Sequence, residues 1–168
     1  MMRVYIPATL AMLQQLVADG SLRPVSGTAF AVTPRLREAY AHGDDEELAE
    51  VALREAALAS LRLLATEGTE PAALPTRRAV LVADIEGVTA RPDLDDAVVR
   101  LAGPVALDNV VATYVDNAAA EPAVAAAVAV IDEADLGDED AELTVGDAQD
   151  HDLAWYATQE LPFLLELL

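Results

Sequence analysis

A continuous apolar run of strand length lies at residues 79–85, with the sequence AVLVADI. An apolar run without alternation is typical of a strand that is buried on both faces. It therefore predicts the central strand of a sheet that other elements cover on both sides, and the rest of the chain can be interpreted around it.

Further strands are predicted on both sides of this run. They have alternating or β-branched sequences, which favour extended structure. We expect Pro7 to end the first of them, and we expect the last to be an edge strand that carries its acidic residues outward. The predicted strands are residues 2–6, 28–32, 98–102, 110–116 and 142–145.

Helices are predicted between these strands from apolar periodicity and from capping residues. Thr9 and Gly20 bound the first helix, and Thr33 with Pro34 opens the second. The longest helix is expected at residues 46–66, and another begins near Pro122 with one apolar face directed at the sheet. A final helix is predicted at residues 153–160, stopped by Pro162.

This order of elements lacks strict strand–helix–strand alternation, which favours the α+β class over a doubly wound sheet. The chain has 168 residues, the length of one domain. We therefore predict a single α+β domain over residues 1–168, an open sandwich of a mixed or antiparallel sheet with helices packed on it and a ferredoxin-like arrangement as one option. A Pro-containing segment at residues 68–76 is expected to be a joint within this domain.

Charge is distributed very unevenly along the chain. Residues 1–83 hold ten acids and eight arginines, whereas residues 84–168 hold twenty acids and only two arginines. Between Asp132 and Asp152, ten of twenty-one residues are acidic. Such a surface repels phosphate backbones, so nucleic-acid binding is not expected, and a basic protein surface is the partner that it favours.

Several classes of chemistry are excluded or disfavoured by composition. Because cysteine is absent, the chain has no disulfide, thiolate zinc site or cysteine nucleophile. The glycines stand singly, so no phosphate-binding loop can be written, and residues 136–143 lack the spacing of a calcium-binding EF-hand loop. We expect no cofactor, no metal and no membrane span, and a cytoplasmic location.

One segment combines aromatic and polar groups that suit a binding site, namely residues 151–160, HDLAWYATQE. On the predicted helix these groups would be close enough to surround a small ligand. The candidate ligand-binding residues are His151, Trp155, Tyr156, Gln159 and Glu160.

Three stretches of the chain resemble a family of uncharacterised actinobacterial proteins. They are RVYIPATL at residues 3–10, ALREAALASLRLLA at residues 52–65 and HDLAWYATQELP at residues 151–162. The resemblance implies that both ends of the chain belong to one domain and that the host is a high-GC bacterium. It implies no activity and no catalytic residues.

Two functional hypotheses follow from the sequence. The first is an acidic protein-interaction or regulatory module that engages a basic protein. The alternative is a small-ligand-binding protein or an enzyme with its site around residues 151–160. A homodimer through the apolar C-terminal segment is a further hypothesis, which does not exclude either of the others.

Overall fold

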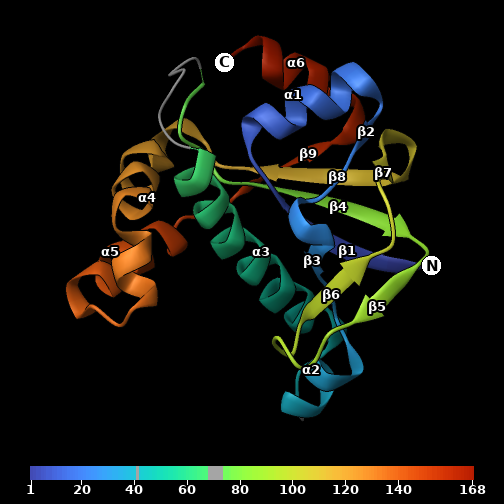
Figure 1. Ribbon diagram of the computed structural model, residues 1–168. Coiled ribbons are helices and arrows are strands. Elements are labelled where there is room, and N and C mark those ends of the chain that lie inside the picture. The colour runs from blue at the N-terminus through green and yellow to red at the C-terminus, as the bar shows by residue number, and fades with distance from the viewer. Residues whose placement is uncertain (41, 68–73) are drawn as a thin grey trace.

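A seven-stranded antiparallel sheet forms the centre of the structure (Figure 1). The computed structural model describes residues 1–40, 42–67 and 74–168. The strand order is β5-β6-β3-β1-β4-β8-β9, and each neighbouring pair is antiparallel. The strands are β1 (Met2–Ala8), β3 (Thr28–Phe30), β4 (Ala79–Ile85), β5 (Val88–Ala90), β6 (Val98–Leu101), β8 (Val110–Val115) and β9 (Ala154–Ala157). The short strands β2 (Ser21–Leu22) and β7 (Val105–Ala106) pair with each other separately.

The predicted central strand is confirmed. β4 lies between β1 and β8, and its side chains are buried alternately on the two faces of the sheet. Val80 and Val82 belong to the core on one face, and Leu81 and Ala83 to the core on the other. The uninterrupted apolar sequence reflects this burial on both sides.

Pro7 does not end the first strand, contrary to the prediction. β1 continues to Ala8 and pairs with β4 along its whole length, with Pro7 opposite Val80. On its other side, β1 pairs with β3 only at Tyr5, opposite Phe30. Beyond Tyr5 that side of β1 is free of a partner among the described strands, and a proline without an N–H is tolerated on such an edge.

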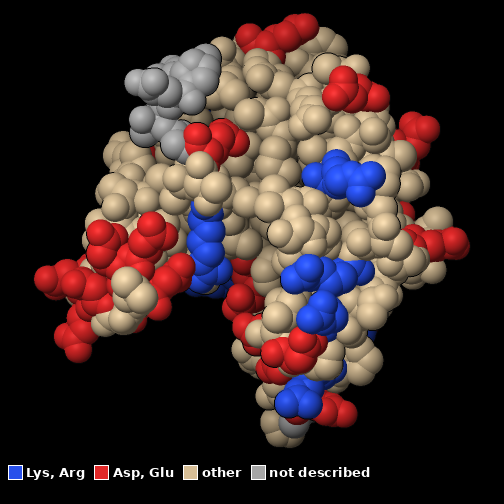
Figure 2. Space-filling model, in the orientation of Figure 1, with Lys and Arg blue, Asp and Glu red and all other residues tan. Residues whose placement is uncertain are grey.

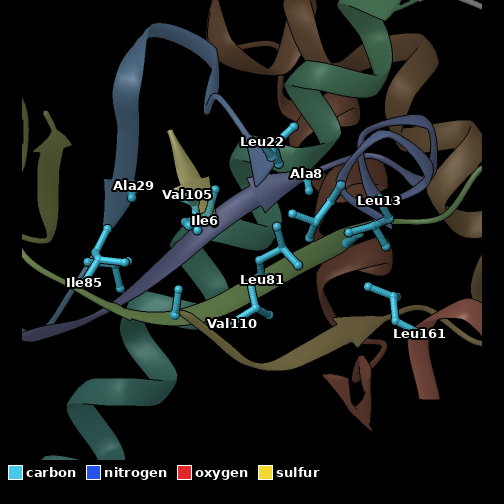
Figure 3. Close-up of a cluster of buried hydrophobic side chains, with 14 of the residues drawn as sticks. Ile6, Ala8, Leu13, Leu22, Ala29, Leu81, Ile85, Val105, Val110 and Leu161 are labelled. Carbon is cyan, nitrogen blue, oxygen red and sulfur yellow. The ribbon is translucent and has the colours of Figure 1, made fainter. Parts of the chain in front are cut away.

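Helices cover both faces of the sheet. On one face, α1 (Leu10–Asp19) and α6 (Leu161–Glu166) pack on the strands through residues such as Leu13 and Leu161 (Figure 3). On the other face, α3 (Asp45–Glu67) crosses the strands, with α2 (Pro34–Ala39) near its first turn (Figure 1). The caps predicted at Thr9 and Thr33 are confirmed, since each side-chain oxygen accepts a backbone N–H three residues further on.

A helical hairpin of α4 (Glu121–Asp135) and α5 (Glu139–Gln149) forms a projection at one end of the molecule (Figure 1). The apolar face of α4 was expected to meet the sheet. It packs instead on α3 and α5, where Leu61, Leu64, Val124 and Ile131 share one core. The hairpin is therefore a layer attached to α3.

Two predictions of local structure near the C-terminus are wrong. Residues 142–145 belong to α5 and form no edge strand, because Asp138 caps that helix by accepting the backbone N–H of Ala141 at 2.9 Å. Residues 154–157 form strand β9, which is followed by a short turn of 3₁₀-helix. Pro162 then lies in the first turn of α6, where its missing N–H costs nothing, so it opens a helix.

The α+β class and the open sheet with packed helices are confirmed. The ferredoxin-like option requires a β-α-β-β-α-β unit, and the seven-strand order does not follow that pattern. Of the expected joint at residues 68–76, residues 68–73 lie outside the described part of the chain. Within that described part, no helix has the length and apolarity required to span a bilayer.

Candidate functional site

A buried ion pair joins the ends of two neighbouring strands of the sheet, β4 and β8. Arg78 directly precedes β4 and Asp116 directly follows β8, and their side chains are 1% and 0% exposed. The Arg78 guanidinium donates from Nε to Asp116 Oδ2 at 2.9 Å and from Nη2 to Asp116 Oδ1 at 2.8 Å. The backbone N–H of Arg78 also donates to Asp116 Oδ2, at 2.7 Å. This bidentate geometry is the strong form of such a pair.

The same guanidinium holds the segment that follows α5. Its Nη1 donates to Gln149 Oε1 at 2.9 Å, and its Nη2 donates to the backbone carbonyl of His151 at 2.9 Å. Gln149 in turn reaches the backbone carbonyl of Arg54 on α3. Arg78 therefore fixes the end of α5 and the approach to β9 against the sheet.

A cavity of about 400 Å³ lies between α3, the sheet and this segment. Its volume is within the range that small-molecule sites occupy. Figure 2 shows the surface hollowed between the α4–α5 hairpin and the N-terminal half of α3. Its lining is Tyr5 and Tyr114 from the sheet; Glu46, Ala49, Glu50, Leu53, Arg54 and Ala57 from α3; Arg78; and Gln149, His151, Asp152 and Leu153.

Two tyrosines form the sheet side of the cavity. Tyr5 on β1 is 9% exposed, and no hydrogen bond to its hydroxyl is present among the described residues. Burial raises the pKa of the Tyr5 phenol, and the nearby Tyr114 phenol raises that pKa further. The Tyr5 hydroxyl is therefore a neutral, unpartnered polar group that the cavity brings within reach of a ligand.

The aromatic surface continues beyond the cavity to the edge of the sheet. Trp155 on β9 lies directly opposite Tyr114 on β8, so the two side chains extend from the same face. Trp155 is 57% exposed. Its ring is therefore open to solvent, whereas the rings of Tyr114 and Tyr5 are more enclosed.

The charge around the cavity is predominantly negative. Arg78 is neutralised by Asp116, so it contributes no net charge to the cavity wall. The remaining charged lining residues are three exposed carboxylates against one guanidinium: Glu46, Glu50 and Asp152 against Arg54.

The five residues predicted as a ligand site are dispersed by the strand that replaces the expected helix. His151 lines the cavity, and Trp155 lies next to it on the same sheet face. Tyr156 has the opposite orientation and packs against the core on the α1 face. Gln159 and Glu160 are exposed, and Glu160 Oε1 accepts the backbone N–H of Ala157 at 3.0 Å.

Sequence reasoning missed the tyrosines and the buried ion pair of this site. The available signal was that Tyr5 and Tyr114 have the only aromatic rings of strands β1 and β8, and each ring carries a hydroxyl. Arg78 directly precedes β4 and Asp116 directly follows β8, and the antiparallel pairing of these two strands brings the two positions together. Over the residues with described placement, no group of three or more His, Asp or Glu side chains has the proximity to hold a metal ion.

The fold and the cavity define an antiparallel α+β protein with a ligand-sized site between one long helix and the sheet. The family of unknown function DUF6912 matches residues 2–165, and the chain belongs to this family. The match includes all three stretches that carried the resemblance, at residues 3–10, 52–65 and 151–162. No curated protein and no solved structure matches the chain.

Proposed function

We propose that this protein binds a small organic ligand in the cavity between α3 and the sheet. One observation carries the proposal: the Arg78 hydrogen bonds hold three separate parts of the chain around a cavity of about 400 Å³. A cavity whose walls are fixed by a buried network is preorganised, so a ligand loses little free energy to ordering of the protein.

The lining also has the composition of a binding site. Ala49, Leu53 and Ala57 supply apolar contact, and the Tyr5 hydroxyl supplies a polar group that lacks a partner. Charged and polar side chains make up about half of the lining residues, so the cavity suits a ligand that has both an apolar and a polar part.

The test is a small-molecule library screened by amide chemical-shift changes on the labelled protein. We expect ligands that shift the amides of Ala49, Tyr114 and His151. The variant Ala49→Phe fills the cavity from α3 and should abolish this binding, whereas Ala126→Phe, at an exposed position of α4, should retain it. The proposal fails if no compound shifts the cavity amides, or if the ligands bind Ala49→Phe as tightly as the wild type.

A second function, docking of a basic protein on the α4–α5 hairpin, is favoured by a separate observation. Figure 2 shows acidic side chains gathered over this projection, and residues 121–149 contain no lysine or arginine. Two leucines within the acidic surface are strongly exposed, Leu136 at 88% and Leu143 at 69%. Exposed apolar side chains surrounded by charge are typical of surfaces that bind another protein.

This second function predicts a partner whose binding weakens as salt rises. Affinity capture with the tagged protein at low and high salt measures it. The triple variant Asp140→Asn, Glu142→Gln and Asp147→Asn removes three exposed carboxylates from α5 and should lose the partner. Equal capture by the variant and the wild type would exclude the hairpin as the docking surface.

A further inference from the structure

We infer that the ligand of this cavity is a small organic cation, an alkylammonium that retains at least one N–H. This inference rests on the proposed function and names its ligand class. It is carried by the charge of the lining, the aromatic surface and the unpartnered Tyr5 hydroxyl.

The charge of the lining residues favours a ligand with a positive charge. The Arg78 guanidinium lines the cavity, but it is neutralised by Asp116 and already occupied by protein groups. Among the exposed lining residues, Glu46, Glu50 and Asp152 outnumber Arg54. Carboxylates placed around a partly enclosed space raise the local concentration of cations and repel anions.

The aromatic rings supply the second element of cation recognition. Tyr5 and Tyr114 line the cavity, and Trp155 extends from the same face of the sheet beside Tyr114. A cation is attracted to the face of an aromatic ring, with tryptophan the strongest and tyrosine next. An ammonium group with an apolar body therefore finds its charge stabilised and its carbon atoms covered by the same surface.

The Tyr5 hydroxyl distinguishes among organic cations. It is part of a side chain that is about nine-tenths buried, and it has no hydrogen-bond partner within the described ranges. The phenol oxygen has lone pairs that accept an N–H donor. Primary and secondary ammonium groups have such a donor, and a quaternary ammonium has none.

The test compares three probes of nearly the same shape and different charge: phenethylamine, phenethyl alcohol and 3-phenylpropionate. Dissociation constants are measured by amide chemical-shift titration at low salt. We expect the amine to bind at least about tenfold more tightly than the alcohol, and the carboxylate to bind least, because hydrogen bonds and contacts to a charged group are the stronger ones. N,N,N-Trimethylphenethylammonium, which lacks an N–H, should bind more weakly than phenethylamine.

Two variants test whether the Tyr5 hydroxyl and a carboxylate of the cavity contribute to amine binding. Tyr5→Phe removes only the hydroxyl, so we expect amine affinity to fall about threefold to tenfold with no change in the thermal midpoint. Glu50→Gln should weaken amine binding as well, whereas Glu139→Gln makes the same charge change on α5, away from the cavity, and should leave it unchanged.

Each contrary result has a defined meaning. If the alcohol or the carboxylate binds as tightly as the amine, or if Glu139→Gln acts like Glu50→Gln, the cation inference is wrong and ligand binding in the cavity still stands. If none of the probes binds, the cation inference is also wrong, and the library screen with Ala49→Phe decides the proposed function separately.

Discussion

Arg78 and Asp116 form an ion pair that is fully removed from solvent, with Nη2 and Oδ1 2.8 Å apart. The pair does more than join β4 to β8, because the remaining donors of Arg78 bind Gln149 and the carbonyl of His151. The stability of the sheet and the shape of the cavity therefore depend on one side chain.

The first prediction concerns this pair. Arg78→Met leaves the Asp116 carboxylate buried without its counter-ion, which should lower the free energy of unfolding by about 3–5 kcal/mol. Urea denaturation measures the change. Arg91→Met is the control, because Arg91 pairs with Asp93 on the surface, where solvent screens the pair, and its loss should change stability far less. Equal effects of the two substitutions would contradict this account of the buried pair.

Ser60 is a second buried polar contact that links a helix to the sheet. Its hydroxyl donates to the Ala8 carbonyl at 2.7 Å and accepts the backbone N–H of Ala79 at 3.1 Å. Ser60→Ala leaves both backbone groups buried and unpaired, so we expect a loss of about 2 kcal/mol in urea denaturation. Thr66→Ala, which removes an exposed hydroxyl from the same helix, should change stability by less than about 0.5 kcal/mol.

The cap of α5 gives a third prediction. Asp138→Ala removes the acceptor for the Ala141 N–H and should lower the free energy of unfolding by about 1 kcal/mol. Asp138→Asn preserves a capping oxygen and should be close to wild type. If both substitutions are equally destabilising, the charge of Asp138 matters more than its hydrogen bond.

Glu55 gives a prediction of pH dependence. Burial raises the pKa of this carboxyl above its ordinary value of 4.5, and the Asp95 carboxylate raises that pKa further. A raised pKa means that the folded state binds the proton more tightly than the unfolded chain does. Protonation of Glu55 therefore stabilises the folded state as the pH falls through the raised pKa toward 4.5. At neutral pH the ionised form opposes folding. Glu55→Gln should therefore raise the thermal midpoint at pH 7 and reduce its gain on acidification, whereas Glu139→Gln, on the exposed surface of α5, should do neither.

Much of the fold could be predicted from local sequence. The run at residues 79–85 fixed the central strand, and Thr9, Gly20 and Thr33 marked helix ends, because capping and burial are determined by residues close in sequence. The two errors near the C-terminus lie where the local pattern is ambiguous. The segment Glu142–Val145 alternates like a strand, yet Ala141, Val145 and Ala148 also recur at helical spacing, and packing against α4 decides between the two patterns.

The site was less accessible to prediction than the fold. His151, one of the predicted candidates, lines the cavity, but its neighbours there come from β1, α3 and β8. Tyr5 and Tyr114 are more than a hundred residues apart in the chain, and only the strand order β1-β4-β8 brings them together. Residues 154–157 were expected to be a helix, although two adjacent aromatic residues favour a strand.

The position of β1 in the middle of the sheet has a consequence for the speed of folding. Met2 pairs with Ile85 and Ala8 pairs with Ala79, so each residue of β1 has a β4 partner more than seventy residues further along the chain. Pairing of strands this distant in sequence requires a large loop to close, and the entropy of closure is lost before the stabilising contacts form. Sheets built on such pairings fold on the order of milliseconds to seconds. During synthesis on the ribosome, β1 is made before β4 and gains this neighbour only after more than seventy further residues have been produced.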